Sequence, residues 1–214
     1  MKINVKLLSR NFNRGGNNPM FIVVHDTLNA SIGADAEAHY KYFNKATTNA
    51  SVHYMVDSTQ VLQIVREGDG AGHVGKGKNG ITNNNSIGIE MCINADGDFK
   101  VTLASTIELV KELMAKYNIP IERVVRHHDA SSWGKICPRS LADNNWEEWF
   151  KFKEALVETP EAITPEWKLN GLKSLSEAGI ITDFEGWAQK IDEPAPNWLV
   201  FELLDRIRKE LNNG

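Results

Sequence analysis

The chain has 214 residues, of which 42% are hydrophobic and 24% are charged, and its formal net charge is −4. This composition supports a globular core, and the chain lacks the basic stripe expected of a nucleic-acid-binding protein. No apolar run is long enough to span a membrane, so membrane insertion is not expected, and two cysteines cannot build a disulfide framework. The first residues lack the apolar segment of a signal peptide, which predicts synthesis in the cytoplasm.

Strand and helix patterns alternate along residues 1–159, which predicts an α/β domain with a central mixed sheet flanked by helices. Residues 21–25 are apolar on both faces, as in a central strand covered on both sides. A helix is expected at residues 34–45, followed by a hairpin of two strands at residues 52–57 and 60–65. His53 in this hairpin has apolar neighbours, so it is interpreted as a hydrogen-bonded core histidine.

Six glycines crowd residues 68–80, and His73 lies among them. The segment lacks the ending of a phosphate-binding loop, so its glycines are expected to let the backbone approach a ligand closely. Residues 87–93 then form a strand with isoleucines on one face and Glu90 on the other. A carboxylate in such a strand is costly to bury unless it serves a partner. That partner is either Arg126 in a buried salt bridge or a catalytic site.

The next expected elements are a helix with Thr102 as its N-cap, a strand at residues 124–125 and a helix at residues 143–157. Within the last helix, core spacing predicts burial of Trp146, Trp149 and Phe150. A short linker between two prolines separates this domain from residues 160–214, which show three short helical patterns. So small a helical module barely sustains its own core, so we expect it to bind a partner or to self-associate.

Residues 126–138 read Arg-His-His-Asp-Ala-Ser-Ser-Trp-Gly-Lys-Ile-Cys-Pro and concentrate metal-binding side chains. A thiolate and an imidazole this far apart reach one ion only if the segment loops back, and Gly134 suits the turn. His25, at the end of its strand, is the best candidate for a third ligand. Two histidines and one cysteine leave the fourth position of zinc to water, as in catalytic sites. The residues alone do not choose between His127 and His128, nor exclude a surface histidine pair beside a buried cysteine.

Five segments, in this order, resemble the zinc-dependent N-acetylmuramoyl-L-alanine amidases of the phage-lysozyme and peptidoglycan-recognition type. The segments are Phe-Ile-Val-Val-His at 21–25, His-Tyr-Met-Val-Asp at 53–57, Gly-His-Val-Gly at 72–75, Asn-Ser-Ile-Gly-Ile-Glu at 85–90 and the segment at 126–138. The resemblance covers about the first 150 residues. It implies a zinc ion held by His25, His127 and Cys137, and bacterial peptidoglycan as the substrate. The bond cut would join the lactyl group of N-acetylmuramic acid to L-alanine.

The resemblance also suggests roles for residues around the metal. Zinc lowers the pKa of a bound water to about 7, and Glu90 would accept its proton and return it to the leaving amine. Lys135 would face the developing oxyanion, and His73 would be a substrate or second-shell contact. Asp129 would either orient a ligand imidazole or cap the loop.

These features predict an endolysin of a phage or prophage that reaches the cell wall after holin-type release. Residues 160–214 would then bind the cell wall or mediate self-association. Two alternatives remain at this stage, namely a peptidoglycan-recognition module without catalytic activity and a cytoplasmic amidase that recycles wall fragments.

Overall fold

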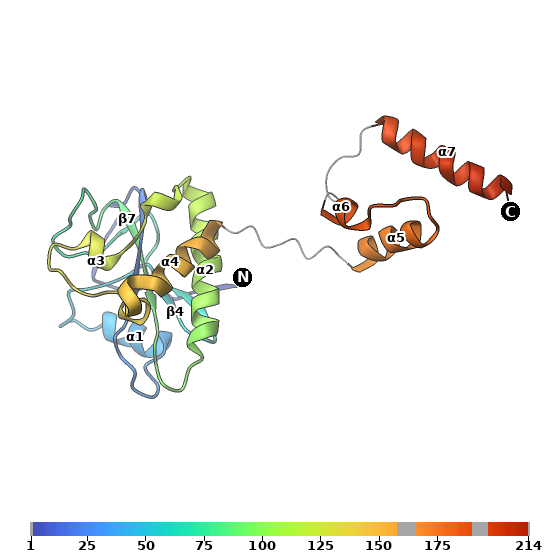
Figure 1. Cartoon of the computed structure of the whole chain (residues 1–214). Coiled ribbons are helices and arrows are strands. Elements are labelled where there is room, and N and C mark those ends of the chain that lie inside the picture. The colour runs from blue at the N-terminus through green and yellow to red at the C-terminus, as the bar shows by residue number, and fades with distance from the viewer. Residues whose placement is uncertain (1, 158–165, 190–196, 214) are drawn as a thin grey trace. The chain divides into compact units, whose positions relative to one another are not determined.

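The computed structural model describes residues 2–157, 166–189 and 197–213. The chain divides into two compact units, Met1–Glu158 and Thr159–Gly214, named here the N-terminal unit and the C-terminal unit (Figure 1). No helix in the described ranges combines the length and the apolar character that crossing a membrane requires.

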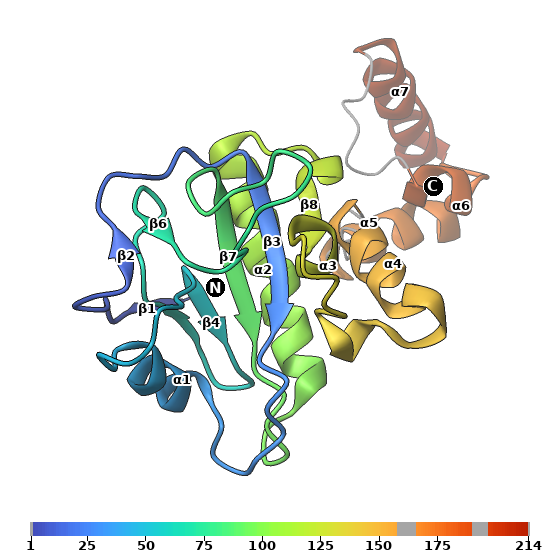
Figure 2. The ribbon, with the colours of Figure 1, turned by 90° about the vertical axis from the view of Figure 1, so that its left-hand side faces the viewer.

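A six-stranded mixed sheet forms the centre of the N-terminal unit, as the alternating patterns predict. Figure 2 shows helix α2 (Phe99–Tyr117) behind the strands at the centre of this sheet. In spatial order the strands are β1 (Ile3–Val5), β5 (Val61–Gln63), β4 (Tyr54–Val56), β7 (Ser86–Met91), β3 (Phe21–Asp26) and β8 (Val124–Arg126). β4 and β5 are antiparallel and form the expected hairpin, whereas the other neighbouring pairs are parallel. The short strands β2 (Phe12–Asn13) and β6 (Gly70–Ala71) pair separately.

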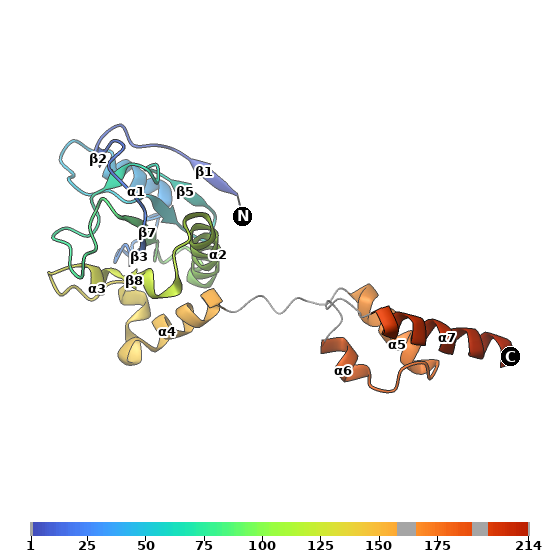
Figure 3. The same ribbon diagram turned by 90° about the horizontal axis from the view of Figure 1, so that it is seen from above.

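Helices cover the sheet on both faces, and the main core lies under α2 and α4 (Asp143–Val157). Buried side chains from strands and helices meet there, including Ile22, Val24, Ile87, Ile89, Leu109, Leu113, Trp149, Phe152 and Leu156. Helix α1 (Ala36–Phe43) packs on the opposite face beside β4 and β5 (Figure 3). The two layers bury the apolar faces that the strand pattern predicts.

The face of the sheet opposite α2 carries the polar residues of interest. Because successive strand side chains alternate, Val23 and His25 share one face of β3 while their neighbours enter the main core. The parallel register places His25 directly beside Glu90 of β7. β8 follows on the other side of β3 and leads straight into helix α3 (His127–Ala130). The ends of three neighbouring parallel strands, β7, β3 and β8, thus bring polar side chains together at one end of the sheet.

The expected N-cap of α2 at Thr102 is wrong. The helix begins at Phe99, and the Asp98 carboxylate accepts hydrogen bonds from the backbone amides of Lys100 and Val101. A carboxylate suits this end because it satisfies free amides and complements the helix dipole. Thr102 instead lies on the buried face of the first turn.

The expected burial of Phe150 is also wrong, because its side chain is 57% exposed. Trp149 is buried as expected, Trp146 is partly buried, and Phe152 takes the place in the core. In the regular part of α4 the buried stripe consists of Trp149, Phe152 and Leu156, which follow helical spacing. Phe150 lies about 100° around the helix from Trp149 and therefore faces outward.

Phe150 and Phe152 provide a matched pair of substitutions on one helix. We expect Phe152→Ala to lower the free energy of unfolding of the N-terminal unit by about 3–5 kcal/mol, because it leaves a cavity in the core. Phe150→Ala should change it by less than about 0.5 kcal/mol. Denaturant titration of both variants measures the difference, and equal losses would contradict the assigned packing.

The C-terminal unit contains α5 (Glu166–Glu177), α6 (Phe184–Gln189) and α7 (Asn197–Asn213). Gly179 follows α5 with φ +69°, a left-handed conformation that commonly ends a helix. Arg206 of α7 donates a hydrogen bond to the carbonyl of Ile180, which connects α7 to the turn after α5. The expected proline-flanked linker lies outside the described residues.

Candidate active site

His25, His127 and Cys137 converge at the edge formed by β3 and β8. One potential ligand atom from each lies within 4.8 Å of the others, and the two imidazole centroids are 4.4 Å apart. His25 comes from the end of β3, and His127 is the first residue of α3, directly after β8. Cys137 returns to the same place at the end of the loop that follows α3. The fold therefore brings together the three residues for which the sequence predicts zinc ligation.

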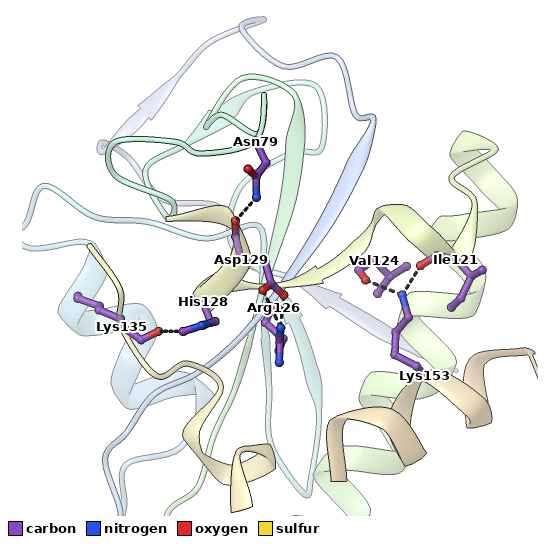
Figure 4. A network of polar contacts seen from close by, with 8 residues as sticks. All are labelled: Asn79, Ile121, Val124, Arg126, His128, Asp129, Lys135 and Lys153. Atoms are coloured by element: carbon purple, nitrogen blue, oxygen red, sulfur yellow. Dashed lines mark hydrogen bonds and ion pairs between the residues drawn. The ribbon is translucent and has the colours of Figure 1, made fainter. Parts of the chain in front are cut away.

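His128 has a different role, because it closes the loop that carries Cys137. Its backbone amide donates to the carbonyl of Cys137 at 2.9 Å, and its Nδ1 lies 2.9 Å from the carbonyl of Lys135 (Figure 4). Since a carbonyl only accepts, Nδ1 is the donor in the second contact. Gly134 has φ +64°, which supports the turn expected at this position. His128 is thus turned toward the loop backbone while His127 faces the other ligands.

Arg126 and Asp129 form a bidentate ion pair with N–O distances of 2.6 and 2.7 Å (Figure 4). The alternative in which Glu90 pairs with Arg126 is therefore wrong. Both carboxylate oxygens of Asp129 face the guanidinium, so neither expected role of that carboxylate is supported. The Arg126 guanidinium also lies 4.2 Å from the centroid of the Trp146 ring, which joins the start of α3 to α4.

All six residues predicted for the site line one cleft of roughly 840 Å³. They are His25, His73, Glu90, His127, Lys135 and Cys137. The sequence did not predict two further features of this cleft. One is the buried carboxylate of Asp26, which accepts a hydrogen bond from the Ser140 amide at 2.6 Å. The other is a pair of aromatic residues at the mouth of the cleft, named here the aromatic rim. Asp26 directly follows His25 in β3, a position that carries no recognisable signal by itself.

The aromatic rim consists of Tyr42 and Trp133, whose side chains are 51% and 58% exposed. The Trp133 ring lies against Gly75, where a Cβ atom would come within 2.6 Å of the ring. Gly75 also has φ +60°, so a side chain there would be strained twice. This glycine was expected to admit a ligand, and in the structure it admits the ring of Trp133.

Glu90 lines the cleft. Its Oε2 atom is buried and has no hydrogen-bond partner within the part of the chain that the structure describes. Burial raises the pKa of Glu90 to about 8, the neighbouring Asp26 adds to the rise, and Lys135 opposes it. A carboxyl group with so high a pKa is suited to exchange protons near neutral pH.

The buried imidazoles are neutral at neutral pH. Burial is the main cause that lowers the pKa of His127 to about 4 and the pKa of His25 well below its ordinary value. Neutral imidazole is the form that binds metals. Nε2 of His127 is buried without a partner among the described residues, and burial raises the pKa of the Cys137 thiol, which a bound cation would reverse. These donors fit a zinc ion.

We expect the metal-free protein to lose stability as the pH falls below about 6.5. His25, His53, His73 and His127 all have lowered pKa values in the fold, to about 4 for His53 and His127. The unfolded chain then binds more protons than the folded chain between about pH 6.5 and 4. Each such histidine contributes up to about 1.4 kcal/mol of lost stability per pH unit. Denaturant titrations at pH 7 and pH 5 test this, and equal stability at both would contradict it.

Comparison with known proteins places the chain among the N-acetylmuramoyl-L-alanine amidases. A family model described as N-acetylmuramoyl-L-alanine amidase matches residues 15–140. The amidase CwlH of Bacillus subtilis is 38% identical over 151 residues, which cover 71% of this chain and 59% of that protein. The amidase XlyA of Bacillus subtilis is 44% identical over 138 residues, which cover 64% of this chain and 44% of that protein. The match therefore spans about half the length of these relatives.

Solved structures agree with this placement. The catalytic domain of XlyA superposes with a TM-score of 0.65 at 38% identity, covering 73% of this chain and 99% of that domain. A mutant endolysin from Bacillus subtilis gives a TM-score of 0.64 at 39% identity, covering 73% and 99% of the two chains. The family match extends from the loop before β3 to the segment just after Cys137 and so includes the whole cleft edge. This chain belongs to the N-acetylmuramoyl-L-alanine amidase family.

Proposed function

We propose that this chain is a zinc-dependent endolysin that hydrolyses the amide bond between N-acetylmuramic acid and L-alanine in bacterial peptidoglycan. The observation that carries the proposal is the convergence of His25, His127 and Cys137 beside Glu90 in a single cleft. Three protein ligands leave one position of a zinc ion open, as in hydrolytic sites. When bound, the metal supplies Lewis-acid activation of a water and of the scissile carbonyl.

In this proposal Glu90 moves the proton. Its carboxylate accepts a proton from the attacking water and returns it to the nitrogen of the leaving L-alanine. A raised pKa makes both steps feasible near neutral pH, since the group neither holds nor releases its proton too strongly. Its position next to His25 in the paired strands keeps it beside the ligand set.

Lys135 supplies positive charge at the same edge. It lines the cleft, and its charge acts on Glu90 and on both ligand imidazoles. We infer that its ammonium donates to the carbonyl oxygen of the substrate as negative charge develops there. The bond from His128 to the Lys135 carbonyl holds the backbone of this residue in place.

Digestion of purified cell walls tests the reaction. We expect new amino-terminal L-alanine without new reducing sugar ends, and reducing ends would instead identify a glycosidase. Binding without any new termini would support a recognition module, against which the presence of Cys137 and Glu90 in one cleft already argues. Release of peptide from soluble muropeptides but not from intact walls would support a recycling amidase.

For the C-terminal unit we propose attachment to the cell wall, with self-association as the alternative. Val200, Phe201 and Leu204 of α7 are exposed apolar side chains, as expected for a surface that binds a partner. Deletion of residues 160–214 should weaken sedimentation with purified walls and leave the cleavage chemistry unchanged. Unchanged wall affinity would contradict attachment, and a change in oligomeric state alone would support self-association.

A further inference from the structure

We propose that His73 and Ser86 form a hydrogen-bonded chain that fixes the tautomer of His25 and leaves its Nδ1 atom as the metal ligand. The inference rests on the proposed function, because it concerns the same metal site. It makes His73 and Ser86 positioning residues that act through His25 and do not touch the substrate.

Three contacts in series carry the proposal. Oγ of Ser86 lies 2.5 Å from the backbone carbonyl oxygen of Thr82. Nε2 of His73 lies 3.2 Å from the same Oγ, and Nδ1 of His73 lies 3.1 Å from Nε2 of His25. His25, His73 and Ser86 are all buried, so the polar atoms in these contacts depend on one another rather than on solvent.

The direction of each hydrogen bond follows from the first one. A carbonyl oxygen only accepts, so the single hydroxyl proton of Ser86 points to Thr82. The Ser86 oxygen must then accept from Nε2–H of His73. A neutral imidazole has one donor and one acceptor, so Nδ1 of His73 accepts from Nε2–H of His25. The remaining nitrogen of His25, Nδ1, is left with a free lone pair.

This proton order is the one that a metal site requires. A histidine ligand binds through an unprotonated nitrogen, and a hydrogen bond at its other nitrogen sets the tautomer and orients the ring. If the chain ran in the opposite direction, His25 would carry its proton on Nδ1 and its lone pair would face His73. Both nitrogens of His73 are engaged inside the protein, by His25 and Ser86, which favours a role in orienting His25 over a contact with substrate.

The fold fixes the His73 ring in this position. Gly88 of β7 lies beneath it, and a Cβ atom there would come within 2.7 Å of the ring atoms Cγ and Nδ1. The backbone amides of His73 and Val74 both donate to Oδ1 of Asn83, at 3.0 and 2.9 Å. The ring can therefore neither sink toward the sheet nor swing away with its loop.

His53 takes no part in the hydrogen-bonded chain, although its ring centroid is 5.7 Å from that of His73. Its Nδ1 accepts from the Gly88 amide at 2.9 Å, and its Nε2 donates to the carbonyl of Asp69 at 3.0 Å. Both nitrogens of His53 are thus engaged elsewhere. The expectation of a hydrogen-bonded core histidine at this position is confirmed.

The tautomer can be measured directly by long-range ¹H–¹⁵N NMR on the full-length, metal-free protein at neutral pH. We expect His25 and His73 each to carry the proton on Nε2 with Nδ1 unprotonated. Protonation of His25 on Nδ1 would overturn the proposal. This readout needs neither bound metal nor cleavage activity, so it stands apart from the test of the proposed reaction.

Substitutions test the link to the metal. Ser86→Ala removes the acceptor that orients His73, so we expect zinc affinity, measured by competition with a chelator, to fall about 10–100-fold. Ser86→Thr keeps the hydroxyl and should restore most of the affinity. Thr82→Ala is the matched control, because Thr82 takes part in the hydrogen-bonded chain only through its backbone carbonyl. Equal zinc affinity in wild type and Ser86→Ala would overturn the proposal.

A second variant covers the case in which Ser86→Ala does not fold. His73→Phe keeps a ring of similar size over Gly88 and removes both nitrogens, and we expect the same loss of zinc affinity with a mixed tautomer at His25. If His73→Phe loses zinc affinity but the wild type fails to digest walls, the hydrogen-bonded chain is supported and the proposed reaction is rejected. If zinc affinity is unchanged in His73→Phe, only the hydrogen-bonded chain is rejected.

Discussion

Replacing Cys137 with serine should strip zinc from the protein and reduce wall hydrolysis to background. The thiolate is the only anionic donor in the proposed set, and a serine hydroxyl stays protonated at neutral pH and binds zinc poorly. Two neutral imidazoles would then hold the ion alone. We expect the loss of zinc affinity to exceed the roughly 10–100-fold that is typical when a residue hydrogen-bonded to a metal ligand is replaced.

Elemental analysis of the purified variant measures bound zinc, and turbidity of a wall suspension measures lysis. Cys92→Ser is the matched control, because Cys92 is buried in the separate cluster beside α1 and does not join the ligand group. It should keep zinc and activity, and the buried hydroxyl should lower only the free energy of unfolding. A Cys137→Ser protein with stoichiometric zinc and normal lysis would remove this residue from the ligand set.

The sequence predicts the site best where strand periodicity controls it. Alternation along residues 87–93 already places Glu90 on the face opposite the isoleucines. Residues 21–25 are apolar on both faces, so alternation shows only that His25 shares a face with Phe21 and Val23. The pairing of His25 with Glu90 then depends on β3 and β7 being neighbours, as they are in the structure.

Prediction fails where the path of one loop decides between neighbouring residues. His127 and His128 are adjacent and equally able to bind a metal, and the choice between them depends on the bonds from His128 to the carbonyls of Lys135 and Cys137. Asp129 likewise looks available in the sequence, but Arg126 occupies both of its oxygens. The residue types and their spacing show neither preference.

The predicted core of α4 is wrong at Phe150 because adjacent residues lie about 100° apart around a helix, so the stripe that buries Trp149 need not bury Phe150. In the structure Phe152 and Leu156 share the buried stripe with Trp149. The start of α4 is also irregular, because Asn144, Asn145 and Trp146 adopt left-handed angles. Asparagine tolerates this conformation well, whereas a tryptophan there is unexpected.

Replacing Glu90 with glutamine should lower kcat by about 10²–10⁴ while leaving bound zinc unchanged. Glutamine has nearly the same shape, but its amide cannot take a proton from water and return it to the leaving amine. The ligand group of His25, His127 and Cys137 remains intact, so metal content separates this variant from Cys137→Ser. Glu147→Gln, on the exposed surface of α4, is the control for loss of a carboxylate alone.

Stability gives a second readout for Glu90, which reports the burial of its carboxyl group independently of catalysis. The pKa of Glu90 is about 8 in the fold, against an ordinary value of 4.5, so between these values the folded metal-free protein holds a proton that the unfolded chain has released. Its contribution to stability therefore decreases as the pH rises from about 4.5 to about 8. Glu90→Gln should remove that decrease, so the variant gains stability relative to wild type at pH 8 more than at pH 5. Full activity in Glu90→Gln would exclude the carboxylate from proton transfer, and loss of zinc would show instead that Glu90 helps to hold the ion.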